Sequence, residues 1–178
     1  MSSLSPTLRI ARDVDDDAIR RIYIQIFDRP AEARFVEAIR QLDQCPQLSM
    51  VAEVDNEISA HLLLSEISLS GCPELKLMAL EPMVVIPKCQ GSGVGRAMVN
   101  VAIEQIRRRG YHAIIAIGPS DYYFRFGFKA LEPLGWNWPF AIGAESIAVA
   151  PLTSELLDIY QGDLDFTPPF YKLFPSRK

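Results

Sequence analysis

The chain has 178 residues, of which 49% are hydrophobic and 22% are charged, and this balance predicts one globular domain with a sizeable core. The net charge of −4 disfavours a nucleic-acid-binding protein, because such proteins are usually basic. Three cysteines without a CxxC pair and only two histidines argue against a disulfide framework and a zinc site, so we expect no metal. No apolar run reaches membrane-spanning length and no leader pattern follows Met1, so we expect a cytoplasmic protein with no membrane partner.

The N-terminal quarter predicts a strand followed by two helices. Residues 8–11 favour a short strand, after a polar segment 1–7 that we expect to be flexible. The acidic residues 15–17 suit the positive end of a helix, and apolar residues at helical spacing continue until Pro30 ends the pattern. A second helix is expected over residues 31–42.

Three strands are expected next, and the third contains a proline. Residues 48–54 and 58–70 favour strands, and the Asp-Asn pair at 55–56 is a plausible hairpin turn between them. The third strand is expected over residues 75–86. Pro82 has no N–H and cannot join a central ladder normally, so it indicates either a β-bulge or an edge strand that tolerates a proline.

A glycine-rich turn follows this strand and leads directly into a helix expected over residues 94–109. Residues 80–95 read LEPMVVIPKCQGSGVG. Backbone N–H groups of such a turn converge at the positive end of the helix and can hold an anion such as phosphate. The alternative is a glycine-rich connection that binds nothing.

The spacing of this turn excludes two common phosphate-binding motifs. A triphosphate loop needs Lys-Ser or Lys-Thr after its last glycine, but Arg96 follows Gly95. A dinucleotide fingerprint needs a glycine at the sixth position, and Met98 stands there when the count starts at Gly93. The remaining pattern is Q-x-x-G-x-G, which begins at Gln90.

A second motif lies about thirty residues downstream. Residues 113–118 favour a buried strand, and Ser120 is expected to cap a short helix that carries two tyrosines. Tyr123 stands five residues before the phenylalanine of the Gly-Phe pair 127–128. In their order and spacing, the two motifs resemble the acyl-CoA pyrophosphate turn and the tyrosine of the GNAT superfamily of N-acetyltransferases. The segments 80–87 and 118–123 look like its YhbS-like bacterial branch.

The resemblance covers roughly residues 8–170 and implies a fold and an activity for a single domain over 1–178. It implies an α/β fold whose mixed, mostly antiparallel sheet is flanked by helices and contains two parallel strands that splay apart. The implied activity is transfer of an acetyl group from acetyl-CoA to a primary amine, by direct attack within a ternary complex. The alternatives are a non-catalytic acyl-CoA-binding regulatory module and a nucleotide-binding switch protein.

The resemblance also implies roles for individual residues. The Met83 N–H would face the thioester carbonyl, and Tyr123, a phenol with a pKa of about 10, would give a proton to the departing thiolate. Glu81 would draw a proton from the amine through water, although it could equally be a solvated or salt-bridged carboxylate, and His61 is a weaker alternative base. Tyr123 could instead only pack against the sheet, with its hydroxyl hydrogen-bonded to a backbone carbonyl. The implied cofactor-binding residues are Met83, Val84, Val85, Gln90, Gly91, Ser92, Gly93, Val94, Gly95, Arg96 and Tyr123.

The acceptor is expected to be a small-molecule amine or a protein amine. It is expected to contact the two N-terminal helices and an aromatic C-terminal region, which could also form the seam of a homodimer or simply belong to the core. The aromatic residues in question are Trp136, Trp138, Phe140, Phe166, Phe170 and Tyr171.

Overall fold

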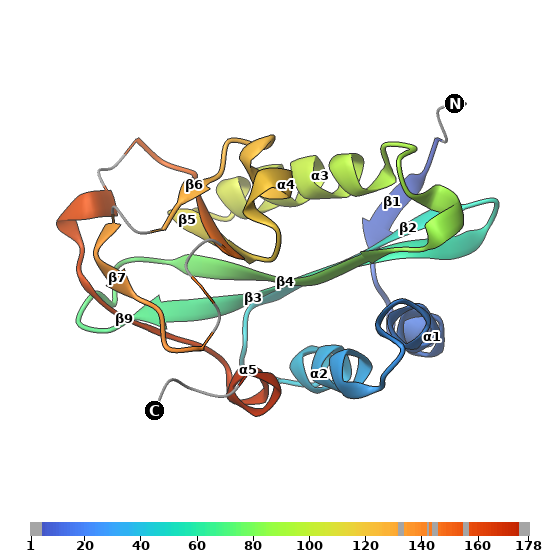
Figure 1. Cartoon of the computed structure of the whole chain (residues 1–178), viewed down its shortest axis with the longest axis horizontal. Coiled ribbons are helices and arrows are strands. Elements are labelled where there is room, and N and C mark those ends of the chain that lie inside the picture. Colours follow the sequence, from blue (N-terminus) through green and yellow to red (C-terminus); the bar gives the residue numbers. More distant parts are fainter. Residues whose placement is uncertain (1–4, 132–133, 142, 144–145, 155–156, 175–178) are drawn as a thin grey trace.

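The computed structural model describes residues 5–131, 134–141, 143, 146–154 and 157–174. One mixed sheet runs through the described part of the molecule (Figure 1). In spatial order its strands are β1 (Thr7–Ile10), β2 (Gln47–Val54), β3 (Glu57–Leu69), β4 (Leu77–Val85), β5 (Ala113–Ile117), β8 (Ile147–Pro151) and β6 (Lys129–Ala130). Two short strands, β7 (Trp136–Asn137) and β9 (Gly162–Asp165), pair with each other, and β9 also pairs with the end of β3.

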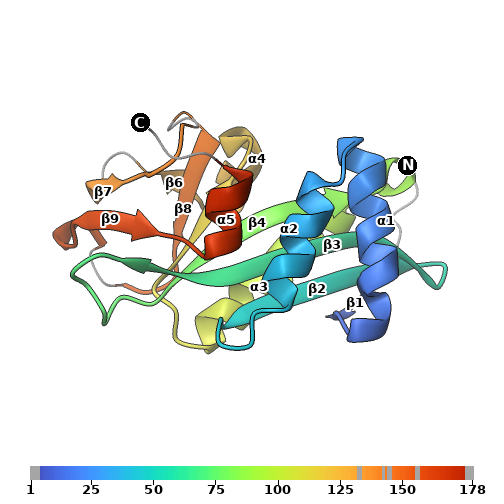
Figure 2. The ribbon, with the colours of Figure 1, turned by 90° about the horizontal axis from the view of Figure 1, so that it is seen from below.

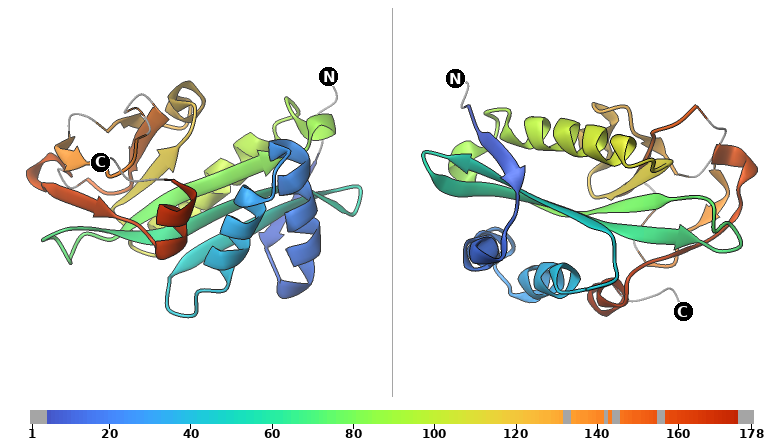
Figure 3. Two further views of the ribbon diagram at one scale, coloured as in Figure 1. Left: turned by 60° about the horizontal axis from the view of Figure 1, so that its bottom comes forward. Right: turned by 180° about the vertical axis from the view of Figure 1, so that it is seen from behind.

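Helices cover both faces of the sheet. Three of them lie side by side on one face (Figure 2): α1 (Asp16–Phe27), α2 (Ala31–Arg40) and α5 (Pro168–Leu173). Two lie on the opposite face (Figures 1 and 3): α3 (Val94–Arg108) and α4 (Ser120–Phe124). Short 3₁₀ turns precede α1 and α3, at η1 (Asp13–Asp15) and η2 (Pro87–Cys89), and a third, η5 (Leu157–Ile159), precedes β9.

The helices and strands up to β5 lie where the sequence predicts them, within a few residues. The hairpin between β2 and β3 turns at Asp55 and Asn56, which have φ angles of 53° and 63°. Short polar side chains tolerate this left-handed conformation, which a tight hairpin requires. The expected cap of α4 is wrong. Pro119 stands at the N-cap, and Ser120 is the first helical residue and makes no capping hydrogen bond.

The feature that opens the sheet is a β-bulge in β4. Leu62 pairs with Met83 whereas Leu64 pairs with Leu80, so β4 has one extra residue over this stretch. The extra residue falls at Glu81 and Pro82, where the missing proline N–H cannot contribute to a ladder. β4 lies between β3 and β5, so the bulge prediction is confirmed and the edge-strand alternative is wrong.

β4 and β5 diverge directly after the bulge begins. They pair in parallel only from Leu77 with Ala113 to Leu80 with Ala116, and β4 then continues to Val85 without a partner on that side. The last residues of β4 are therefore paired with β3 on one edge and face a gap on the other. The expected splayed parallel strands are present.

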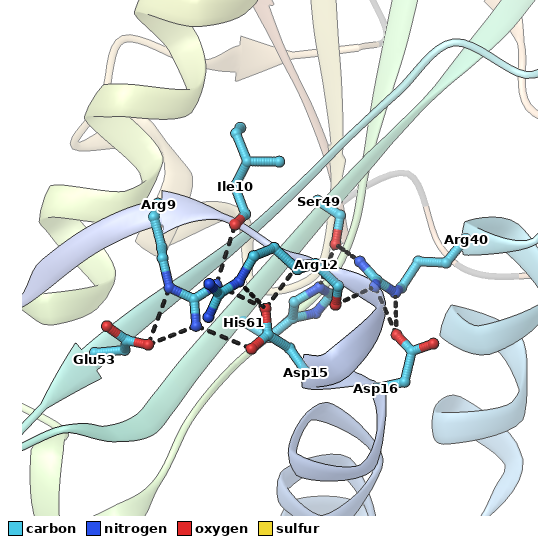
Figure 4. Close-up of polar contacts among 9 residues, drawn as sticks. All are labelled: Arg9, Ile10, Arg12, Asp15, Asp16, Arg40, Ser49, Glu53 and His61. Atoms are coloured by element: carbon cyan, nitrogen blue, oxygen red, sulfur yellow. Dashed lines mark hydrogen bonds and ion pairs between the residues drawn. The ribbon is translucent and has the colours of Figure 1, made fainter.

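An ion-pair cluster fixes the start of α1 to the sheet (Figure 4). The Arg9 guanidinium, on β1, donates to Asp15 at 2.6 and 2.9 Å and to Glu53, on β2, at 3.0 and 2.5 Å. The Arg12 backbone N–H also donates to Asp15 at 2.7 Å. These hydrogen bonds, that of Arg9 above all, lower the pKa of the buried Asp15 carboxyl to about 2.

We predict that Asp15→Asn lowers the free energy of unfolding by about 2 kcal/mol at pH 7, because it removes charge-assisted hydrogen bonds to a buried carboxylate. The unfolded carboxyl takes up its proton near pH 3.8, the native one only near 2. The difference in free energy of unfolding between the wild type and Asp15→Asn is therefore fully present above pH 4 and shrinks as the pH falls toward 2. Urea unfolding across this range measures it.

Glu57→Gln is the matched control, because Glu57 belongs to an exposed ion pair with Lys88 and should change stability little. A difference between wild type and Asp15→Asn that stays constant from pH 7 to pH 2 would contradict the role given to Asp15.

Candidate active site

The turn between β4 and α3 depends on two glycines for its backbone conformation and on two side-chain hydrogen bonds for its shape. Gly91 and Gly93 have φ angles of 71° and 94°, a region that non-glycine residues rarely adopt. Ser92 Oγ donates to the Cys89 carbonyl at 2.6 Å, and Gln90 Nε2 donates to the Val85 carbonyl at 2.8 Å. The first N–H groups of α3 have no intrahelical acceptor, so the turn presents donors at the positive end of a helix.

A pocket of about 460 Å³ adjoins this turn. Its lining residues come from β4, the turn, α3 and the segment around α4: Met83, Val85, Cys89, Gln90, Gly91, Gly93, Gly95, Arg96, Tyr122, Arg125 and Phe126. Two guanidinium groups, those of Arg96 and Arg125, add positive charge to the donors of the turn. A concave site with this charge suits a phosphate-bearing ligand.

Gly95 is required for close approach. A Cβ atom at this position would lie 2.8 Å from Tyr122 Oη and 3.4 Å from a Val85 methyl carbon. Tyr122 therefore packs over the first turn of α3 and forms one wall of the pocket. Burial raises the pKa of Tyr122, and the nearby Arg125 and Arg96 oppose this shift.

A second cavity of about 500 Å³ begins where the pocket ends. Its lining is largely apolar and comes from both faces of the gap: Phe27, Arg29, Glu32, Glu81, Pro82, Met83, Ile117, Gly118, Pro119, Tyr123, Ser146, Phe170 and Phe174. Met83 lines both spaces, so the two meet at the bulged end of β4.

The main chain of β4 offers two N–H groups to the gap. Ile86 N–H donates to the Ser59 carbonyl of β3 at 2.9 Å, so the N–H groups of Ile86 and Val84 point toward β3. Alternation along a strand turns the N–H groups of Met83 and Val85 to the opposite edge, where β5 has diverged. Two donors therefore face the space between the splayed strands.

Tyr123 lies at the meeting point of α4 and β5. It is 5% exposed, and its ring packs against Tyr122 and Phe128 at centroid distances of 5.3 and 5.4 Å. None of the described residues forms a hydrogen bond with its hydroxyl, so the alternative of a tyrosine tied to a backbone carbonyl is not seen. Burial raises the pKa of Tyr123, so the phenol keeps its proton at neutral pH.

Glu81 is buried in the second cavity and forms no ion pair with any of the described residues, so the alternative of a solvated or salt-bridged carboxylate is wrong. It is 1% exposed, Ser65 Oγ donates to its Oε1, and its Oε2 has no hydrogen-bond partner among the described residues. Burial raises the pKa of Glu81 to about 8, and the Ser65 hydrogen bond opposes the shift. A carboxyl group with such a pKa can exchange a proton near neutral pH.

Comparison with known proteins assigns the family. Residues 16–128 match the acetyltransferase (GNAT) family model. The chain belongs to the GNAT family. It is 30% identical over 142 residues to the uncharacterized N-acetyltransferase YjhQ of Escherichia coli K12, with 78% of each chain covered. It is 28% identical over 142 residues to the uncharacterized N-acetyltransferase YhbS of the same strain, with 78% of this chain and 82% of YhbS covered.

Solved structures support the same assignment of fold. The E. coli YhbS structure in complex with CoA superposes with a TM-score of 0.87 at 23% identity, covering 96% of this chain and 94% of that one. A GNAT acetyltransferase from Brucella melitensis in complex with acetyl-CoA gives a TM-score of 0.75 at 25% identity, covering 93% and 98%. The family, its YhbS-like branch and the fold class expected from the sequence are confirmed.

This acetyltransferase brings most of its sequence-predicted site residues to the two spaces. The pocket at the turn includes Met83, Val85, Gln90, Arg96 and the three glycines, and the second cavity includes Glu81, Met83 and Tyr123. Val84 and Val94 have buried side chains that face the core, and the Ser92 side chain is used to close the turn. Tyr122, Arg125 and Phe126 also line the pocket at the turn, although none of them was predicted to bind the cofactor. Their spacing around Tyr123, in and directly after a short helix, was the available signal.

The aromatic C-terminal region is divided between core and cavity. Phe170 and Phe174 line the second cavity, whereas Trp138, Phe140 and Phe166 pack on one another at 5.1–5.2 Å between ring centroids. His61 lines neither space, which removes it as a base. Among the described residues, no cluster of three or more His, Cys, Asp and Glu could hold a metal. No helix in the described part of the chain is long and apolar enough to cross a bilayer.

Proposed function

We propose that this GNAT protein transfers an acetyl group from acetyl-CoA to a primary amine by direct attack within a ternary complex. The observation that carries the proposal is the meeting of two spaces at Met83, one with anion-binding donors and the other with a buried proton donor and a buried carboxyl group. The relatives crystallised with CoA and acetyl-CoA support the choice of cofactor.

The cofactor would bind along the pocket that adjoins the turn. N–H groups of residues 91–95 and the Arg96 and Arg125 side chains would hold its diphosphate, as expected at a helix N-terminus. The pantetheine arm would enter the gap and pair with the Val85 N–H like an added strand. Its thioester carbonyl would then reach the Met83 N–H.

Each chemical step would use a group at the junction of the two spaces. The neutral amine attacks the thioester carbon, and the C–N bond forms while the Met83 N–H stabilises the oxyanion. The C–S bond then breaks, and Tyr123 gives its proton to the departing thiolate. Glu81 takes the proton that the amine nitrogen loses, through a bridging water.

The second cavity favours a small amine with an apolar body over a protein lysine. Phe27, Phe170 and Phe174 supply aromatic walls, and Glu32, which is buried, already pairs with Arg29. Glu81 also lines this cavity and forms no ion pair with any of the described residues, so its carboxyl group would be available to the amine. The cytoplasmic location of the protein remains a prediction. Its assembly into a homodimer in solution also remains a prediction.

We predict that Tyr123→Phe lowers kcat on the order of 100-fold, because the thiolate would leave without its proton donor. CoA affinity should stay within about threefold, since the phenylalanine preserves the ring packing. Turnover of a panel of primary amines with apolar bodies, together with calorimetric titration of CoA, measures both quantities.

Tyr111→Phe is the matched control, because the Tyr111 hydroxyl bonds to Glu66 and Tyr111 lines neither space. An unchanged kcat in Tyr123→Phe would remove Tyr123 from the mechanism. Tight CoA binding with no amine acetylated by the wild type would instead favour the non-catalytic acyl-CoA-binding module.

We predict that kcat/KM rises with pH through an inflection near 8, the pKa of Glu81, because only the ionised carboxylate accepts a proton. Glu81→Gln should lose this inflection and keep the one that belongs to the amine substrate. Two acceptors of different amine pKa separate the two effects. If the inflection moves entirely with the amine and is unchanged in Glu81→Gln, Glu81 is not the base.

A further inference from the structure

A chain of hydrogen bonds runs from α2 across the neighbouring strands β2 and β3 to α1 and the bulge of β4. Arg40 Nη1 lies 2.5 Å from Ser49 Oγ, and Ser49 Oγ lies 2.8 Å from His61 Nε2 (Figure 4). His61 Nδ1 lies 3.0 Å from Tyr23 Oη, which in turn hydrogen-bonds to the Pro82 carbonyl oxygen. These five residues come from α2, β2, β3, α1 and β4, far apart in the chain.

The chemistry of the two ends determines the direction of every bond in this line. A guanidinium can only donate and a carbonyl oxygen can only accept. Tyr23 must therefore donate to Pro82 and accept from His61 Nδ1–H. Burial lowers the pKa of His61 to about 3, so the ring is neutral and its Nε2 accepts from Ser49. Ser49 Oγ then accepts from Arg40. Each hydroxyl and each ring nitrogen of the line therefore has a hydrogen-bond partner of the correct type.

The last acceptor belongs to the peptide group that the proposed reaction uses. The Pro82 carbonyl and the Met83 N–H are opposite ends of one planar peptide unit and point in opposite directions. We propose that Tyr23, supported by His61 and Ser49, is a positioning residue that fixes this peptide and strengthens the Met83 N–H as the oxyanion donor. This inference rests on the acetyl transfer proposed above.

Two observations favour this role over simple core packing. Pro82 has no partner in the β3–β4 register because of the bulge, so its carbonyl oxygen needs another hydrogen-bond donor, and Tyr23 supplies it. Hydrogen bonds that all run in one direction polarise one another, and each bond is strengthened by roughly 10–30%. The line also begins at a fixed cation, because Arg40 donates to Asp16 at 2.6 and 2.9 Å.

The test is the infrared carbonyl band of bound acetyl-CoA labelled with ¹³C at the acetyl carbonyl, which needs no acceptor amine. In the wild type we expect this band at lower frequency than in free acetyl-CoA, because the Met83 N–H polarises the carbonyl. Tyr23→Phe should lose most of this shift, and Ser49→Ala part of it. The affinity of both variants for acetyl-CoA should stay within about threefold of the wild type, since the diphosphate contacts are untouched.

Tyr111→Phe is the matched control, because it also removes a tyrosine hydroxyl that donates a hydrogen bond, and it should keep the full shift. A full shift in Tyr23→Phe, with only a lower melting temperature, would overturn the positioning role. If Tyr23→Phe does not fold, a full shift in Ser49→Ala overturns it instead. A wild type that binds acetyl-CoA with no shift would contradict Met83 as the oxyanion donor, which is a failure of the proposed function itself.

Discussion

The interrupted pairing of β4 at Pro82 is the constraint on which the rest of the site depends. A proline in a central strand cannot complete the ladder, and the strand absorbs it as a bulge of one extra residue. Beyond this point β4 keeps β3 as its neighbour and loses β5. The gap, the two N–H groups that face it, and the meeting of pocket and cavity at Met83 all follow from this single departure from regular pairing.

Burial by the surrounding residues sets the pKa of the two ionisable side chains at the gap, Tyr123 and Glu81. Tyr123 and Glu81 are both removed from water, and burial raises the pKa of each. The consequence differs because a phenol starts near 10 and a carboxyl near 4.5. Tyr123 is thereby kept as a proton donor, whereas Glu81 is brought into the range where it can accept one.

Local sequence was sufficient for the secondary structure up to β5 and for the turn between β4 and α3. The glycines at 91, 93 and 95, the hairpin at 55–56 and the proline in β4 each impose a backbone geometry within a few residues of themselves. The expected cap at Ser120 failed for an equally local reason, because Pro119 already occupies the N-cap. The splayed strands came from resemblance to a family rather than from periodicity.

Contacts between segments that lie far apart in the chain could not be predicted from the sequence. The raised pKa of Glu81 depends on burial in a cavity that residues of α1, α2 and α5 also line. Its hydrogen bond comes from Ser65 on another strand. The position of Tyr122 against Gly95 depends on how α4 docks on α3. The line from Arg40 to Pro82 joins five separate elements, and no pattern along the chain marks its members as partners.

The most direct test is a crystal structure of this chain with acetyl-CoA bound. We expect the diphosphate on the main-chain N–H groups of residues 91–95, and the thioester carbonyl oxygen within hydrogen-bonding distance of the Met83 nitrogen. Acetyl-CoA bound at another surface, or no binding at millimolar concentration, would contradict it.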